Sequence, residues 1–210
     1  PIPPSMDYGF KDLKDPNAYN VDRAKQLLAE DGWKDTDGDG ILDKDGKPLT
    51  FNFVVYNSRA ELPLYAEAVQ ADLKKVGIDM KIKTVDYNLI DKMGQDGDYD
   101  MLISNIVTAN TGDPIWFLAN YWHTNDNGSN PQNGSGYSNP QVDQLLDAAE
   151  TEFDPAKRRD YAIQIQQLLM NDGAALFLGY PKTNIVTGSY LKGAVMYPSD
   201  YYWITNKITK

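Results

Sequence analysis

The chain contains no cysteine and a single histidine, and these two shortages exclude several kinds of chemistry. Without cysteine there can be no disulfide bond, no thiolate zinc site and no cysteine nucleophile. A serine hydrolase triad would have to use His123, which falls at a predicted helix end, where a histidine commonly contacts the last backbone carbonyls. Nucleotide-binding, metalloprotease and nucleophile-elbow motifs are missing as well. The sequence therefore offers little support for an enzyme.

Positive charge is also scarce. The chain has 20 Lys and Arg residues against 30 Asp and Glu residues, which leaves a net charge of −10. Because a nucleic-acid backbone is bound by a basic protein face, we expect no nucleic-acid partner. The same charge balance argues against a basic helix that lies on a membrane surface.

Long apolar runs and a signal peptide are missing too. No stretch of about 18 apolar residues is present that could cross a membrane. The proline-rich opening at residues 1–5 is typical of an exposed linker. We therefore expect a fragment of a longer protein whose targeting signal lies upstream, with a linker or hinge-proximal segment at 1–19 and a folded lobe at 20–210.

The chain does have clear hydrophobic periodicity. Its 210 residues, of which 41% are hydrophobic, are enough for one large domain or two small ones. Apolar residues at helical spacing predict helices at 21–31, 60–76 and 87–93. Alternating or continuously apolar stretches predict strands at 49–56, 78–85 and 100–107. The third strand is the most continuously apolar, so we expect it at the centre of a sheet.

Asp-Pro and Asn-Pro pairs mark the starts of further helices. Proline is favoured after a capping side chain because its missing N–H is not needed in the first helical turn. These helices are predicted at about 114–122, 140–151 and 155–171. Beyond them, strands are predicted at 174–180, 183–187 and 202–205. Helices between strands imply crossover connections, so the predicted class is α/β, with a mixed, largely parallel sheet flanked by helices.

An acidic segment at residues 34–46 resembles the first half of an EF-hand calcium loop. The candidate ligands for a structural Ca²⁺ are Asp35, Asp37, Asp39, the Ile41 carbonyl and Asp43. The glutamate usual at the twelfth position is replaced by Gly46, and a strand rather than a helix follows. A calcium site and an acidic turn without an ion are both open, and no other cofactor is expected.

The loop at residues 108–114 leaves a predicted strand and enters a helix. An open α/β sheet places its ligand crevice at such a position, outside the carboxyl ends of the strands. The sequence therefore predicts a ligand-binding loop here.

Several short motifs, in their order along the chain, resemble a known family. They are an A-K-x-L-L helix within 20–33, an L-x-x-x-G-I joint at 73–78, a Y-D strand at 99–101, a D-P turn at 112–114 and a Y-x-N-P-x-x-D motif at 137–143. The chain resembles the family 5 solute-binding proteins of ABC importers, the oligopeptide-, dipeptide- and nickel-binding group. The likeness is to their C-terminal lobe, a periplasmic-binding-protein-like fold.

The resemblance implies a set of ligand contacts. In this family two lobes close over a solute, and the strand-to-helix loop faces the cleft. The implied contacts are Thr108, Asn110, Thr111, Asp113, Trp116 and Tyr137. In peptide-binding relatives an aspartate at the position of Asn110 often pairs with the α-amino group of the ligand. The amide of Asn110 carries no net charge, which argues against a zwitterionic peptide.

The resemblance implies the substrate-binding component of an ABC transporter that imports peptides or related small solutes, without catalysis. Its partners would be the small-molecule or peptide ligand, the membrane permease and the N-terminal lobe of the same receptor. Its location would be extracytoplasmic, in a periplasm or as a cell-surface lipoprotein. Three alternatives stay open: an acidic extracellular hydrolase domain, a nickel or metal-chelate binder that uses His123, and a calcium-stabilised adhesion module.

Overall fold

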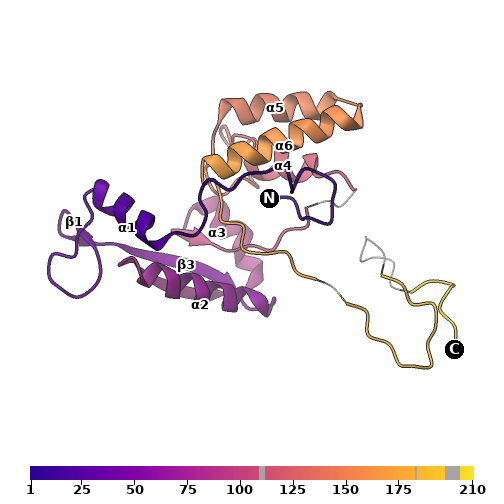
Figure 1. Cartoon of the computed structure of the whole chain (residues 1–210), viewed down its shortest axis with the longest axis horizontal. Helices are drawn as coiled ribbons and strands as arrows, with labels where there is room; N and C mark the ends of the chain where they lie inside the picture. Colours follow the sequence, from indigo (N-terminus) through magenta and orange to yellow (C-terminus); the bar gives the residue numbers. More distant parts are fainter. Residues whose placement is uncertain (109–111, 183, 197–203) are drawn as a thin grey trace.

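A three-stranded parallel sheet forms one half of the molecule (Figure 1). The computed structural model describes residues 1–108, 112–182, 184–196 and 204–210. Strand β3 (Thr50–Tyr56) lies between β4 (Asp79–Val85) and β5 (Met101–Leu102). The connections between these parallel strands pass through helices, as parallel pairing requires. The predicted α/β class, with a parallel sheet flanked by helices, is confirmed.

The third strand is shorter than the sequence predicts and lies at the edge of the sheet. Residues 100–107 were expected to form a central strand, but only Met101–Leu102 pair with β3. The central strand is β3, whose last four residues are all buried. After β5 the Ile103 N–H still donates to the Val54 carbonyl of β3 at 3.0 Å. Ile103 and Ile106 then pack into the two main hydrophobic cores.

The core of this half lies between the sheet and the helices that connect its strands. These are α2 (Glu61–Lys74), after β3, and the short pair η1 (Tyr87–Leu89) and α3 (Ile90–Asp96), after β4. The buried side chains of this core are Phe53, Val54, Val55, Tyr56, Leu62, Ala66, Met80, Ile90, Met93 and Ile103. The helices predicted at 60–76 and 87–93 are confirmed, with small shifts at their ends.

Helix α1 (Val21–Glu30) and a small hairpin cover the other end of the sheet. The Asn20 side chain accepts a hydrogen bond of 2.9 Å from the Arg23 N–H and caps α1, the helix that the sequence predicts at 21–31. The acidic segment at 34–46 runs into a hairpin that the sequence analysis did not predict, formed by β1 (Asp43–Lys44) and β2 (Lys47–Pro48). Its two turn residues, Asp45 and Gly46, both have positive φ, the conformation that favours an Asp-Gly pair in a two-residue turn.

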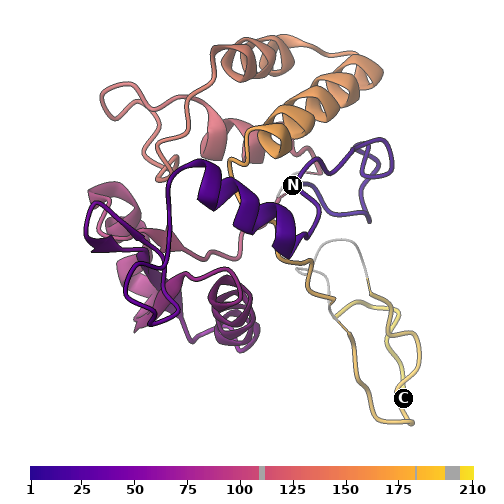
Figure 2. The ribbon, with the colours of Figure 1, turned by 60° about the vertical axis from the view of Figure 1, so that its left-hand side comes forward.

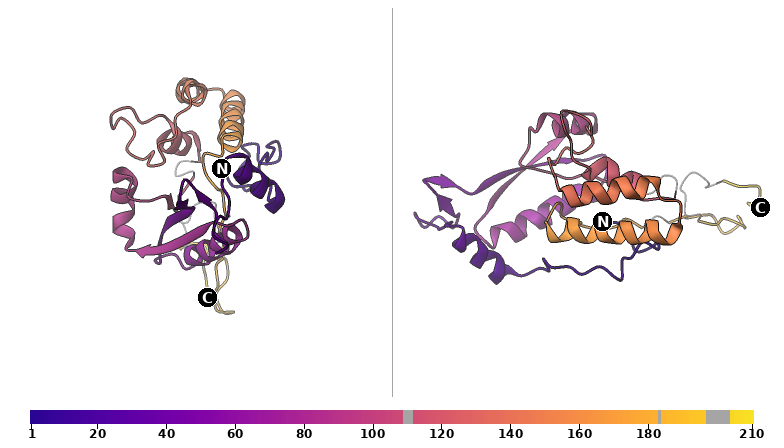
Figure 3. Two further views of the ribbon diagram at one scale, coloured as in Figure 1. Left: turned by 90° about the vertical axis from the view of Figure 1, so that its left-hand side faces the viewer. Right: turned by 90° about the horizontal axis from the view of Figure 1, so that it is seen from above.

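Three helices form the second half of the molecule: α4 (Ile115–Trp122), α5 (Pro140–Thr151) and α6 (Pro155–Asn171). Figure 3 shows α5 and α6 side by side. Asn139 and Asp154 cap α5 and α6 with their side chains, and both helices begin at the predicted prolines. Fully buried residues from all three helices, such as Leu118, Leu146 and Ile165, form their common core. None of the described helices is both long and apolar enough to cross a membrane.

The N-terminal segment packs along α6. Ile2 is 1% exposed and belongs to the helical core, and its N–H donates to the buried side chain of Gln166. Gly9 has a φ of +82°, and a Cβ there would lie only 2.2 Å from Ile163 of α6. Residues 1–17 therefore form a strap that lies along the helical half and is anchored there by Ile2 and Gly9. The domain boundary proposed after residue 19 stays a prediction.

After α6 the chain first packs on the two halves, because Phe177 contacts the helical core and Leu178 the core of the sheet half. The C-terminal segment, of which residues 184–196 and 204–210 are described, extends away from both halves (Figures 1 and 2). The strand predicted at 174–180 is wrong, and so is that at 183–187 for the described residues 184–187. A strand needs a neighbour, and no described strand pairs with these residues. Of the strand predicted at 202–205, residues 202 and 203 lie outside the described residues, as does residue 183, and residues 204 and 205 form no strand.

Candidate functional site

The carboxyl ends of the three parallel strands meet at one edge of the sheet, and the predicted ligand loop leaves from this edge. After β5 the Asn105 N–H donates to the hydroxyl oxygen of Tyr56, the last residue of β3, at 3.0 Å. This bond keeps the chain at the edge as it continues to Thr108, which is half-buried. Asn110 and Thr111 lie outside the described residues, so their predicted ligand contacts stay predictions.

Asp113 is held by structural bonds. One of its carboxylate oxygens accepts a hydrogen bond of 2.9 Å from the Ile115 N–H, and α4 starts at Ile115, one residue later than predicted. The other oxygen pairs with the Arg158 guanidinium. Arg158 also donates to the carbonyls of Ala149 and Glu152 at the end of α5. Arg158 thus ties the D-P turn to α5 and α6 and fixes the direction in which the loop enters α4.

Trp116 and Tyr137 lie in different surroundings. Trp116, in the first turn of α4, is 49% exposed and available to a ligand. The Tyr137 hydroxyl donates to Asp172, just beyond the end of α6, at 2.6 Å. Burial, together with that hydrogen bond and the negative charge of Asp172, raises the pKa of Tyr137 above its usual value. The hydroxyl is therefore committed to Asp172.

Asp113 and Tyr137 contact opposite ends of α6. Asp113 binds Arg158 in the first turn, and Tyr137 binds Asp172 after the last turn. Fourteen residues separate these two positions, which is about 20 Å along a helix. A short ligand does not reach both positions, whereas an extended peptide of about six residues or more does. Tyr137 as a ligand contact stays a prediction.

Residues at the sheet edge that the sequence analysis did not select make a second group. Tyr87, directly after β4, packs edge-on against Tyr56 with ring centroids 5.1 Å apart. The Asn105 side-chain amide lies 3.4 Å from a carboxylate oxygen of Glu61, the first residue of α2. Arg59 is exposed in the turn between β3 and α2. Arg59, Glu61 and Tyr87 follow the ends of predicted strands, and that position is the signal that could have identified them. Asn105 falls inside the strand predicted at 100–107, so the sequence carried no such signal for it.

His123 lies at the C-terminal end of α4, beside acidic residues of α5. Its Nε2 is 3.3 Å from Asp147 and its Nδ1 is 3.7 Å from Asp143, at the rim of a hollow of about 320 Å³. Burial lowers the pKa of His123. Hydrogen bonds to the Thr124 carbonyl and Asp147, with the negative charges of Asp143 and Asp147, outweigh burial and raise the pKa above its usual value. Both ring nitrogens of this histidine thus have protein partners.

The polar loop after His123 is fixed by buried amides. Asn133, which is 3% exposed, donates to the carbonyls of His123 and Tyr137 at 3.0 and 2.8 Å. Asn130 donates to the same His123 carbonyl at 2.7 Å. The Tyr99 hydroxyl donates to the Gly134 carbonyl, so the loop also binds the sheet half of the molecule. The Asn130 and Asn133 bonds thus fix the shape of the loop, and the Tyr99 bond joins it to the sheet half.

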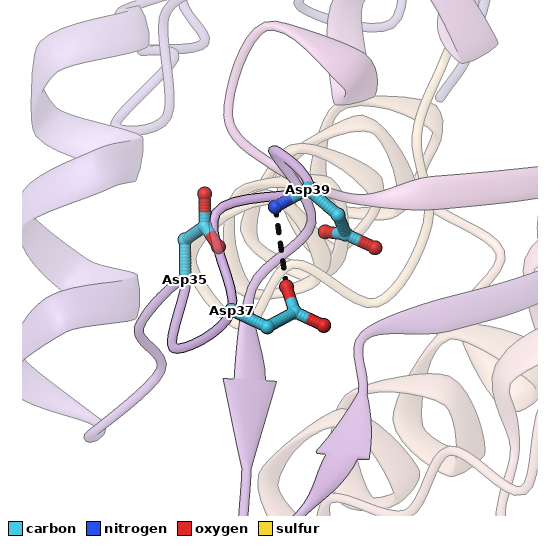
Figure 4. Close-up of side chains that lie close together, drawn as sticks. All are labelled: Asp35, Asp37 and Asp39. Atoms are coloured by element: carbon cyan, nitrogen blue, oxygen red, sulfur yellow. Dashed lines mark hydrogen bonds between the residues drawn. The ribbon is translucent and has the colours of Figure 1, made fainter.

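The acidic loop brings three predicted metal ligands together. Asp35, Asp37 and Asp39 each offer a carboxylate oxygen within 4.8 Å of the others, all three are exposed, and Figure 4 shows them around one turn of the loop. Asp43 faces the same loop, because its carboxylate accepts hydrogen bonds from the N–H and hydroxyl of Thr36. The Ile41 N–H donates to Asp39 at 2.7 Å. The carboxylates also accept several backbone N–H groups, so the loop conformation has internal support without an ion.

Calcium binding by this loop stays a prediction. At a calcium concentration a hundredfold above Kd, binding would raise the free energy of unfolding by about 2.7 kcal/mol. For a chain of this size that corresponds to a rise in Tm of about 5–10 °C. Thermal melts in millimolar calcium and in chelator measure the difference. A variant with both Asp37→Asn and Asp39→Asn should show no rise in Tm with calcium. If the unsubstituted chain has the same Tm in calcium and in chelator, the loop does not bind calcium.

Comparison with known proteins identifies the family. A model described as "Bacterial extracellular solute-binding proteins, family 5 Middle" matches residues 1–129. The chain belongs to this family. It is 32% identical over 196 residues to the oligopeptide-binding protein AppA of Bacillus subtilis, which covers 90% of this chain and 34% of AppA. The resemblance inferred from the sequence motifs is confirmed.

Solved structures of relatives have the same fold. The structure of B. subtilis AppA in complex with a nonapeptide has a TM-score of 0.70 and 30% identity, and covers 86% of this chain and 36% of AppA. The structure of DppA of Helicobacter pylori in complex with the peptide STSA has a TM-score of 0.73 and 26% identity, and the match covers 92% of this chain and 35% of DppA. The structure of NikA from Brucella suis in complex with Fe(III)-EDTA has a TM-score of 0.68 and 27% identity, and the match covers 82% of this chain and 34% of NikA. The chain thus spans about a third of the length of these relatives.

Proposed function

We propose that this chain is the C-terminal lobe of the substrate-binding component of an ABC importer. The complete receptor would bind peptides or related small solutes outside the cytoplasm, without catalysis, and deliver them to a membrane permease. The observation that carries the proposal is the membership of family 5. The sheet edge supports it, because it combines a strand-to-helix loop, the exposed Trp116 and polar side chains at the position where α/β folds bind ligands.

The N-terminal lobe of the same receptor is the proposed partner of the C-terminal segment. Val186 and Ile204 in this segment are 93% and 90% exposed, and the segment extends away from the two halves (Figure 2). Apolar side chains that are fully exposed in one part of a protein commonly mark a surface that another part covers. The share of each relative outside the region matched here leaves room for such a lobe.

Peptides are favoured over the alternatives. AppA and DppA are relatives whose structures hold peptides, whereas the NikA structure holds a metal chelate. Both ring nitrogens of His123 already have protein partners, and among the described residues only the Asp35 loop gathers three metal-ligating side chains. The family is one of solute-binding proteins, and no comparison supports the hydrolase domain.

A two-lobe site predicts that this chain alone binds solute far more weakly than the complete receptor. A receptor with a Kd of about 1 µM has about 8 kcal/mol of binding free energy. A lobe that keeps half of this would bind at about 1 mM, about 1000-fold more weakly. The complete receptor is first incubated with a tryptic digest of casein to find the peptides that it retains. Calorimetry with one of these peptides then measures its Kd on the complete receptor and on this chain.

The outcomes separate the parts of the proposal. Retention of peptides by the complete receptor and weak binding by this chain would support both peptide binding and the two-lobe site. Equal affinity on the two proteins would mean that the whole site lies within these 210 residues. No retained peptide would contradict peptide binding itself.

A further inference from the structure

The polar loop between α4 and α5 contains the tripeptide Asn-Gly-Ser twice, at 127–129 and at 133–135. Asparagine is chemically labile, and it is most labile before glycine. Glycine has no Cβ, so its backbone nitrogen can approach the side chain of the preceding asparagine closely. Because the two tripeptides are identical, a difference in their reactivity has to come mainly from the structure around them.

The first tripeptide lies in an open turn. Asn127 and Gly128 are both exposed and have φ values of 55° and 85°, as in a two-residue turn of type I′. The turn is closed by its flanking residues, since the Ser129 N–H donates to the Asp126 carbonyl at 3.1 Å. Within the part of the chain that the structure describes, neither the Asn127 side chain nor the Gly128 N–H forms a hydrogen bond. Few bonds therefore oppose the approach of these two groups.

The second tripeptide is held in place by its neighbours. Asn133 is 3% exposed, and its side-chain nitrogen donates to the carbonyls of His123 and Tyr137 at 3.0 and 2.8 Å. The Gly134 N–H donates to the Gln132 carbonyl at 2.9 Å. Both groups that would react at this position are thus bound to other partners, and these bonds have to break first.

We propose that Asn127 is a site of spontaneous covalent modification and that Asn133 is protected from it. The backbone nitrogen of Gly128 attacks the side-chain carbonyl carbon of Asn127 and gives up its proton, and the side-chain nitrogen leaves as ammonia. One water molecule then opens the resulting cyclic imide. Opening at one of its carbonyls gives aspartate, and opening at the other gives isoaspartate. This inference goes beyond the proposed function and does not depend on it.

The modification acts on the loop that follows the end of α4. Either product adds a negative charge beside Asp126, and isoaspartate also lengthens the backbone of the turn by a carbon atom. Directly after the turn, Asn130 donates to the Ala119 and His123 carbonyls at 3.1 and 2.7 Å and lines the hollow beside His123. Residues 126–129 belong to none of the hydrophobic cores, so the modified chain should stay folded.

Mass spectrometry of this chain after incubation at mildly alkaline pH tests the proposal. Chymotrypsin cleaves after Trp122 and Tyr137, which gives one peptide, 123–137, with both tripeptides. Loss of the amide raises the mass by about 1 Da, because an NH₂ group becomes a hydroxyl, and fragmentation assigns the rise to one asparagine. In the folded chain Asn127 should be converted about 10- to 100-fold faster than Asn133, because conversion of Asn133 requires local opening. A sample digested at time zero measures conversion during the digestion itself.

Incubation in guanidinium chloride is the matched control. The unfolded chain presents two identical tripeptides, which should be converted at similar rates. Asn127→Ser should remove the fast conversion and leave the slow one at Asn133 unchanged, and circular dichroism shows that each chain is folded. The proposal is wrong if the folded chain converts both asparagines at the same rate. It is also wrong if Asn127 of the folded chain stays unconverted while the unfolded chain reacts.

Discussion

Replacement of Gln166 with alanine should lower the free energy of unfolding of this chain by about 2–4 kcal/mol. Gln166 is fully buried in α6. Its carbonyl oxygen accepts a hydrogen bond from the Ile2 N–H at 3.0 Å, and its amide donates to the carbonyls of Tyr8 and Ala162 at 2.8 and 3.0 Å. Alanine would leave the groups of the N-terminal strap without partners and open a cavity beside them. The strap should then detach from α6.

Urea denaturation monitored by tryptophan fluorescence and circular dichroism measures this effect. Gln164→Ala is the matched control, since Gln164 is exposed on the same helix and bonds only to the Asp160 carbonyl one turn earlier. Its stability should stay close to that of the unsubstituted chain. Limited proteolysis should cut Gln166→Ala first within residues 1–17. Equal stability of the two variants would mean that the strap does not contribute to the fold.

Replacement of Arg158 with methionine is the second change for which we expect a large effect, a loss of about 2–4 kcal/mol. The Arg158 side chain is 21% exposed and donates to two carbonyls at the end of α5 as well as to Asp113. Methionine retains the apolar stem but leaves these acceptors without a donor. Because Asp113 directs the loop into α4, the complete receptor should also bind its solute more weakly.

Arg159→Met is the control for Arg158→Met. Arg159 pairs with Asp7 and Asp12, which are 91% and 56% exposed, and water screens such pairs. Its replacement should change stability little and leave solute binding as it is. Denaturation of this chain and calorimetry on the complete receptor give the two readouts. If Arg158→Met matches Arg159→Met in both, the turn is not held by Arg158.

The helix starts could be read from the sequence because their causes are local. Asn139 and Asp154 each accept backbone N–H groups of the next residues, and a proline follows each of them. Such a cap involves a few consecutive residues and acts wherever the helix finally packs. Asn20 caps α1 in the same local way, with Val21 instead of a proline after it. The family likeness also rests on motifs of this short-range kind.

The strands could be read only in part. β3 and β4 were recognised from their apolar pattern, but the position of β3 at the centre depends on which strands pair. Residues 104–107 and 174–180 have the apolar character of strands, and yet neither stretch forms a strand in the structure. A side chain in a packed core and one on a strand give the same hydrophobic signal, so pairing cannot be deduced from the pattern.

The sequence by itself determined the α/β class, the helix boundaries, the acidic loop and the family. Only the tertiary structure decided that Gln166 holds residues 1–17 as a strap and that Arg158 forms an ion pair with Asp113. It also decided which residues lie at one edge of the sheet, namely Glu61, Asn105, Tyr56 and Tyr87. Arg158 and Asp113 are 45 positions apart in the sequence, and Ile2 and Gln166 are 164 positions apart. Contacts at such separations depend on how helices and strands pack together, and local sequence preferences carry no information about them.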